Sequence, residues 1–74
     1  MKLPLLSSRE LCKFLEKQGF VVDRQKGSHR FYKHNDGRAT TVPIHTNKDI
    51  SRGLLGAILD EIGMERNEFF KLRK

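Results

Sequence analysis

The chain has 74 residues, of which 36% are hydrophobic, and its formal net charge at pH 7 is +6. A chain of this length forms one small domain with a thin core, so we expect residues 1–74 to be a single domain. The apolar start is too short for a signal peptide or a membrane span, and the single cysteine, Cys12, excludes an internal disulfide. We therefore expect a cytoplasmic protein without a membrane partner. Its positive charge favours nucleic acid as a partner, or else an acidic protein.

The first predicted element is a helix from about Ser8 to Gln18. The four residues that begin at Ser7 have the pattern of a capping box. In this motif Ser7 accepts a hydrogen bond from the amide of Glu10, and the Glu10 side chain reaches back. Gly19 follows at the expected end of the helix, where a left-handed backbone is common.

Three strands are expected next, over Phe20–Arg24, His29–His34 and Arg38–Ile44, because these segments are rich in β-branched and aromatic residues. Gln25–Ser28 is predicted to be the first turn. Asn35–Gly37 is a strong hairpin signal, since aspartate and glycine tolerate the dihedral angles of tight turns. The three strands therefore form an antiparallel meander.

A second helix is predicted where apolar residues recur at helical spacing from Ile50 to Ile62, with Asp49 or Ser51 as its cap. A short final helix is expected over Glu65–Leu72, held by Phe69 and Leu72. Two substantial helices cover a three-stranded sheet most economically from one face, which leaves the other face exposed. The predicted fold class is α+β, in the order α-β-β-β-α, with a short extra C-terminal helix.

The stretch Lys26–Tyr32 is the strongest candidate for a chemical site, because it places a glycine, a serine and His29 among cations. Metal-free RNA cleavage needs a base for the 2′-hydroxyl, an acid for the leaving oxygen and cations for the phosphate. Histidine suits either proton-transfer role near pH 7. Lys26, Arg30 and Lys33 are the nearest cations. On spacing alone, a structural or merely exposed histidine remains the simpler interpretation.

The three histidines, His29, His34 and His45, show none of the recognised spacings of metal ligands. We therefore predict no metal site. The chain also has no phosphate-binding loop, dinucleotide fingerprint or serine elbow, so no cofactor is expected.

Strand alternation leaves the orientation of His29 open, because either Phe31 or Tyr32 faces the core. If Tyr32 is buried, His29 lies on the open face of the sheet beside Lys33. If Phe31 is buried, His29 starts on the face that the helices cover. A bulge at Gly27 would change the count.

The chain resembles the HicA toxins, small mRNA interferases of toxin–antitoxin pairs. The resemblance rests on Gly27-Ser28-His29 after the first strand, on Val42-Pro43-Ile44-His45, and on the second helix. It implies a fold like the double-stranded RNA-binding domain, in agreement with the predicted order of elements. It also implies ribosome-independent mRNA cleavage with one key histidine, which maps onto His29, and a HicB antitoxin that covers that histidine.

The chain is thus expected to be the toxin of a type II toxin–antitoxin system and a metal-independent endoribonuclease, monomeric when free and part of a larger complex with its antitoxin. His29 is the predicted catalytic residue, and Gly27 and His45 are possible accessory residues. The candidate RNA-binding residues are Lys26, Ser28, Arg30, Lys33, Lys48 and Arg52. Two alternatives are a non-catalytic RNA-binding module of the same fold and a protein that binds an acidic partner.

Overall fold

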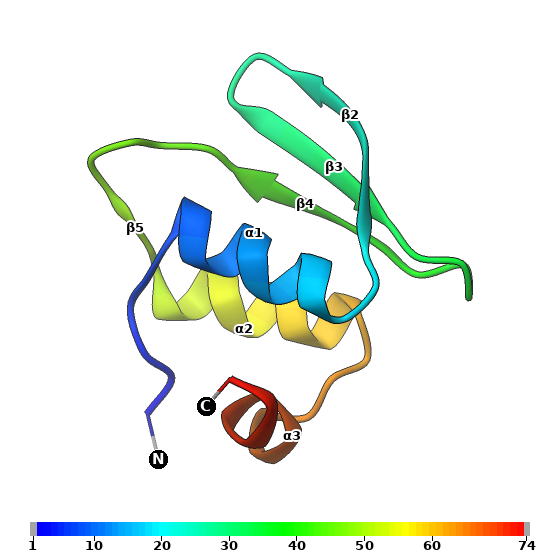
Figure 1. Cartoon of the computed structure of the whole chain (residues 1–74). Helices are drawn as coiled ribbons and strands as arrows, with labels where there is room; N and C mark the ends of the chain where they lie inside the picture. Colours follow the sequence, from blue (N-terminus) through cyan, green and yellow to red (C-terminus); the bar gives the residue numbers. More distant parts are fainter. Residues whose placement is uncertain (1, 74) are drawn as a thin grey trace.

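The computed structural model describes residues 2–73 and has an α+β fold, shown in Figure 1. Its elements in order are β1 (Leu6–Ser7), α1 (Ser8–Lys17), β2 (Val21–Lys26), β3 (His29–Lys33), β4 (Ala39–Pro43), β5 (Asp49–Ile50), α2 (Arg52–Glu61) and α3 (Arg66–Leu72). The predicted fold class is confirmed. Strands β1 and β5 were not expected; they pair antiparallel, with Leu6 opposite Ile50. No helix within residues 2–73 is both long and apolar enough to cross a bilayer.

Helix α1 begins with the predicted capping box. The Ser7 hydroxyl accepts a hydrogen bond of 3.1 Å from the Glu10 amide, and the Glu10 carboxylate accepts one of 2.9 Å from the Ser7 amide. These two bonds satisfy backbone donors that the first helical turn leaves free. The helix ends at Gln18, and Gly19 takes a φ of +94°, which suits a residue without a side chain.

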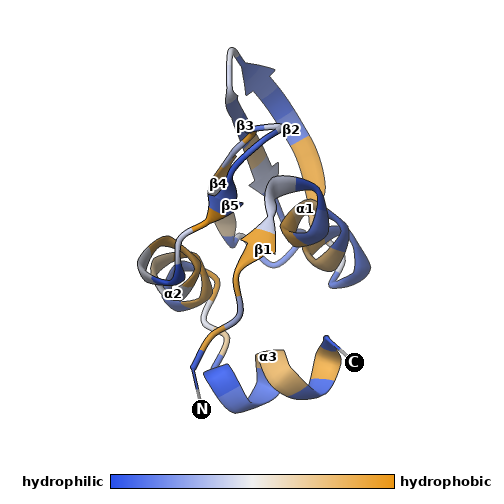
Figure 2. Ribbon diagram, turned by 90° about the vertical axis from the view of Figure 1, so that its left-hand side faces the viewer, coloured by the Kyte–Doolittle hydropathy of each residue, from blue (hydrophilic) through white to orange (hydrophobic). Residues whose placement is uncertain are grey.

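The sheet has the strand order β2-β3-β4, and all its pairs are antiparallel. Helices α1 and α2 lie on the same side of it, and α3 lies beyond them (Figures 1 and 2). The prediction of helices on one face is therefore confirmed. The buried apolar side chains form one cluster, in which the largest fully buried members are Tyr32, Phe20, Phe69, Leu6, Leu11, Leu15, Leu55, Leu59, Ile62 and Val42.

Strand β2 runs to Lys26, so the predicted turn shortens to Gly27 and Ser28. Lys26 pairs with His29 across this two-residue loop. Gly27 has a φ of +59°, as the first central residue of a type II′ turn requires. A bulge is present, but it lies at Asp23 rather than at Gly27, where the register shifts within β2. The outer end of this hairpin is hydrophilic in Figure 2.

Helices α2 and α3 both contribute buried side chains to the core. Ser51 caps α2, since its hydroxyl accepts a 3.1 Å hydrogen bond from the Leu54 amide, whereas Asp49 lies in β5. Phe69 holds α3 in place, fully buried and edge-on to the Phe14 ring at 5.0 Å. Leu72, the last residue of α3, is 41% exposed, so it contributes less to holding this helix than Phe69 does.

Candidate nucleic-acid interface

The burial of Tyr32 decides on which face His29 lies. Tyr32 is only 1% exposed, and its hydroxyl donates a 2.7 Å hydrogen bond to the Glu16 carboxylate on α1. Burial raises the pKa of the Tyr32 hydroxyl well above its usual range. Because side chains alternate along a strand, His29 lies on the opposite, open face, and it is exposed there. Of the two orientations that the sequence left open, this is the one with Tyr32 in the core.

The open face of the sheet carries rows of side chains from three strands, because residues directly opposite each other in an antiparallel pair lie on one face. The row at the hairpin end contains Lys26, His29 and Pro43, and the next contains Arg24, Phe31 and Thr41. The two-residue loop pairs Lys26 with His29, and Arg24 stands two residues before Lys26, so both basic residues of β2 point to this face. His29 is therefore flanked by cations from a neighbouring strand.

Phe31 contributes an aromatic surface to the same face. Its side chain is half-buried, and the Arg24 guanidinium stacks over the ring, 4.7 Å from its centroid. The Lys33 ammonium forms an ion pair of 3.3 Å with Asp23, and both side chains are exposed to water. Arg24 and Lys26 thus supply most of the free positive charge near His29.

The structure brings the two motifs of the sequence together. The Ile44 amide donates a 2.6 Å hydrogen bond to the Ser28 carbonyl, and Pro43 is the cross-strand partner of His29. Behind them the buried Ser8 hydroxyl donates to the Pro43 carbonyl at 2.7 Å and accepts from the His45 amide at 3.1 Å. The Gly-Ser-His turn is therefore supported by the Val-Pro-Ile-His segment and, through Ser8, by α1.

Arg30 lies on the other face of β3, toward α1. Its Nε donates a 2.9 Å hydrogen bond to the Gln25 side chain, and the neighbouring Tyr32 hydroxyl raises the pKa of its guanidinium. A cavity of about 510 Å³ opens beside it. The cavity is lined by Ser7, Ser8, Arg9, Cys12, Lys13, Glu16, Arg30, Ile44, His45 and Thr46.

Arg9 and Lys13 are lining residues that the sequence analysis did not single out. They stand four residues apart on α1, so they occupy neighbouring places on one side of that helix. Their spacing is visible in the sequence, but their relation to Arg30 depends on how α1 packs against the sheet.

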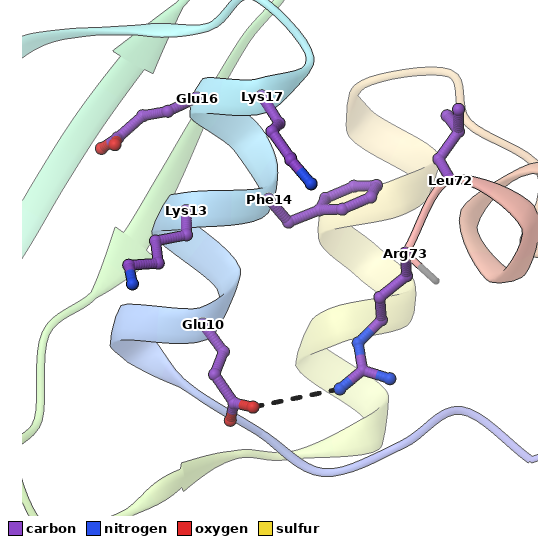
Figure 3. A pocket seen from close by; sticks show the side chains of 7 residues that line it. All are labelled: Glu10, Lys13, Phe14, Glu16, Lys17, Leu72 and Arg73. Atoms are coloured by element: carbon purple, nitrogen blue, oxygen red, sulfur yellow. Dashed lines mark ion pairs between the residues drawn. The ribbon is translucent and has the colours of Figure 1, made fainter.

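A second cavity, of about 780 Å³, lies between α1 and α3 (Figure 3). It is lined by Glu10, Lys13, Phe14, Glu16, Lys17, Leu72 and Arg73. Its charges are mixed, and Arg73 lies 4.0 Å from the Glu10 carboxylate. No histidine lines it, and Figure 3 shows Phe14 and Lys17 directed toward α3 while Lys13 and Glu16 point toward the sheet. This larger cavity therefore lacks a group suited to proton transfer near neutral pH.

The other predicted site residues lie away from the sheet or serve the fold. Lys48 is exposed in the segment before β5, and Arg52 begins α2, where its Nε donates a 2.7 Å hydrogen bond to the Leu3 carbonyl. The structure does not place these two on the face that carries His29.

His34 packs edge-on to Phe20 at 4.9 Å, with Nε2 3.1 Å from the Gln18 carbonyl oxygen. Within residues 2–73 no group of three or more ligand side chains is arranged to hold a metal ion.

Residues 8–64 match the family described as "HicA toxin of bacterial toxin-antitoxin". The chain belongs to this HicA toxin family. The match runs from the start of α1 to just beyond α2, and it includes His29, the Val-Pro-Ile-His segment and all residues that line the cavity beside Arg30 except Ser7. It confirms the predicted family, and it makes the chain a HicA toxin for which an antitoxin partner is implied. A search of curated proteins gave no match.

Proposed function

We propose that this HicA toxin is a metal-independent endoribonuclease of a type II system, which cleaves mRNA in the cytoplasm with His29 as its general acid or base. The observation that carries the proposal is the exposure of His29 on the open face of the sheet, in one row with Lys26 and beside the row that holds Arg24 and Phe31. An imidazole that is accessible to a polyanion can transfer a proton, and the cations around it can stabilise the phosphate charge that develops in phosphodiester cleavage.

In the proposed reaction the 2′-hydroxyl of a nucleotide attacks the adjacent phosphorus, and the bond from phosphorus to the 5′-oxygen breaks. His29 takes the proton of the hydroxyl or gives one to the leaving oxygen. The charge that develops on the phosphate is balanced by Lys26 and by Arg24, while the planar Arg24 guanidinium, stacked on Phe31, offers a surface on which a base stacks.

The proposed RNA contacts extend beyond this row. Lys33 lies on the open face, Ser28 lies in the turn beside His29, and Gly27 gives the turn its shape. Arg30 and His45 belong to the cavity on the other side of β3. Lys48 and Arg52 form a separate basic contact at the start of α2, where the helix N-terminus also attracts phosphate.

The test is cleavage of labelled RNA by the purified chain in the presence of a chelator. We expect products with the wild type. In the His29→Ala variant we expect a rate at least about 100-fold lower, which is the low end of what general acid–base catalysis contributes. Because His29 is exposed, its thermal unfolding curve should match the wild type.

Lys71→Ala is a suitable control, because it removes a cation from α3 and leaves the sheet untouched. Cleavage by a clean His29→Ala preparation at the wild-type rate would refute the assignment. RNA binding without any products from the wild type would instead identify the chain as a non-catalytic RNA-binding module.

A HicB-type antitoxin is the proposed protein partner, with an acidic or polar surface that covers the His29 face. We further propose that the free toxin is a monomer and that it joins a larger complex with the antitoxin. Light scattering of each form tests this, and a stable tetramer of the free chain would contradict it. An antitoxin gene beside the toxin gene would support the pairing.

A further inference from the structure

The cavity beside Arg30 is strongly basic. Arg9 and Lys13 face it from α1 and Arg30 faces it from β3, while Glu16 is its only carboxylate. That carboxylate already accepts the hydrogen bond of the buried Tyr32 hydroxyl. The permanent charges of the lining therefore sum to two positive charges, before any contribution from His45.

The lining also offers donors suited to a tetrahedral oxyanion. Ser7, His45 and Thr46 also line it, and each has a side chain that can donate a hydrogen bond. Arginine binds phosphate through parallel N–H donors, and lysine binds it as a point charge. Arg30 donates its Nε to Gln25 and has the Tyr32 hydroxyl as a second neighbour. Its guanidinium carries five N–H groups, and the residue lines the cavity.

The cavity lies at the same end of β3 as the proposed catalytic residue. His29 and Arg30 are consecutive, and they point to opposite faces of the strand. Ile44 also lines the cavity; its amide donates to the Ser28 carbonyl, and the residue before it pairs with His29. A polyanion held at His29 therefore has to turn only around the edge formed by the hairpin loop and the end of β4 to reach the cavity.

We propose that this cavity binds a phosphate group of the substrate RNA that neighbours the phosphate attacked at His29. This inference rests on the proposed function, since it takes RNA as the substrate and gives it a second anchoring point. The cavity would fix the RNA backbone on one side of β3 and so place the scissile bond on the other.

The test measures binding of a short single-stranded RNA whose 2′-hydroxyls are methylated, so that no cleavage occurs. The cavity variant is Arg9→Gln with Lys13→Gln, and the control variant is Lys17→Gln with Lys71→Gln. Both variants remove two cations from exposed helix positions, but only the first pair lines the cavity. We expect about a tenfold loss of affinity in the cavity variant, and a salt dependence flatter by about 0.7 per lost phosphate contact. The control should lose much less.

Inorganic phosphate is the second probe, followed by NMR shifts of backbone amides in the wild type. We expect the largest chemical-shift changes for the backbone amides of Ser8, Arg9, His45 and Thr46, because these residues line the cavity. Equal losses of RNA affinity in the two variants would overturn the proposal, and so would phosphate binding without any RNA binding. Unchanged RNA affinity with weakened binding of the cognate antitoxin would overturn it as well, and would assign the cavity to the protein partner.

The catalytic role of His29 and the phosphate site in the cavity can be refuted independently, because RNA affinity is measured here without cleavage. If the cavity variant binds RNA as the control does while His29→Ala abolishes cleavage, the nuclease stands and the cavity site is refuted. If affinity falls only in the cavity variant and His29→Ala cleaves normally, the cavity site stands without the proposed catalytic residue.

Discussion

The side-chain hydroxyl of Ser8 donates a 2.7 Å hydrogen bond to the carbonyl oxygen of Pro43, and thereby joins the start of α1 to the end of β4. The same oxygen accepts a bond from the His45 amide, and the side chain is only 3% exposed. Because Pro43 is the cross-strand partner of His29, this buried hydroxyl supports the strand on which the proposed catalytic residue depends.

Replacing Ser8 with alanine should destabilise the protein by about 1–3 kcal/mol, because a partly buried carbonyl and amide lose their partner. It should also lower RNA cleavage, since the end of β4 loosens beside His29. Chemical denaturation and the cleavage assay measure the two effects. Ser51→Ala is the control for stability: it removes the exposed cap of α2 and should cost about 1 kcal/mol. Wild-type stability and cleavage in Ser8→Ala would contradict this role.

The pH at which Tyr32 ionises is a direct test of its burial, and Tyr32 is the only tyrosine in the chain. Burial raises its pKa in the folded protein well above the ordinary value of about 10. Ionisation therefore favours the unfolded chain. The resulting stability is complete below the unfolded pKa, and it is lost as the pH rises from there toward the folded pKa.

We expect tyrosinate absorbance to appear near pH 10 in denaturant and only at clearly higher pH in the folded protein. The Tyr32→Phe variant provides the blank, since it has no tyrosine. If the tyrosine titrates at the same pH in both states, the Tyr32 hydroxyl is not buried against Glu16 as described above.

Thr40 carries a buried hydroxyl that has no hydrogen-bond partner within the described residues. Burying an unpaired polar group is unfavourable, so Thr40→Val, which keeps the shape of the side chain, should raise the free energy of unfolding by about 1 kcal/mol. Thr41→Val, one residue along on the open face, should change it by less than about 0.5 kcal/mol. Thermal or denaturant unfolding compares the two. A destabilised Thr40→Val protein would mean that the hydroxyl has a partner after all.

Gly27 and Gly53 form a matched pair for testing the hairpin turn. A methyl group at either position meets open space, but Gly27 has a φ of +59° and Gly53 lies in α2. Gly27→Ala should therefore destabilise the protein by about 1–2 kcal/mol, through backbone strain alone. It should also weaken cleavage, because Lys26 and His29 flank the turn. Gly53→Ala should stabilise by about 0.5–1 kcal/mol. Equal stabilities for the two variants would refute the turn geometry.

The elements that local chemistry specifies could be predicted from the sequence. The capping box of α1 lies within four residues, and the turn at Gly27 depends on one residue's dihedral freedom. The pairing of β1 with β5 could not be predicted, because each strand has two residues and gains its partner only when α1 and α2 pack together. The motif around His29 was visible in the sequence, but the face of the sheet on which His29 lies was not. That face depends on Tyr32 reaching Glu16 on another element.

The cavity beside Arg30 could not be predicted either, because it too depends on contacts between elements that are distant in the sequence. Arg30 was expected to join Lys26 and Lys33 as an RNA contact, yet alternation along β3 turns it to the opposite face. Its neighbours in space, Arg9 and Lys13, belong to a helix in which no site residue was predicted. Only the packing of α1 against the sheet places them together.

The two-residue loop of the β2–β3 hairpin decides where the cations of β2 point. All six side chains of β2 are exposed, so no core contact fixes which of them point to which face. The pairing of Lys26 with His29 across the loop does so, and Arg24 then pairs with Phe31 on the same face. A loop longer or shorter by one residue would shift this register and transfer two cations to the far side of the sheet, while the hydrophobic residues and the net positive charge stay in place. The length of the loop, rather than the charge of the chain, therefore places the cations beside His29.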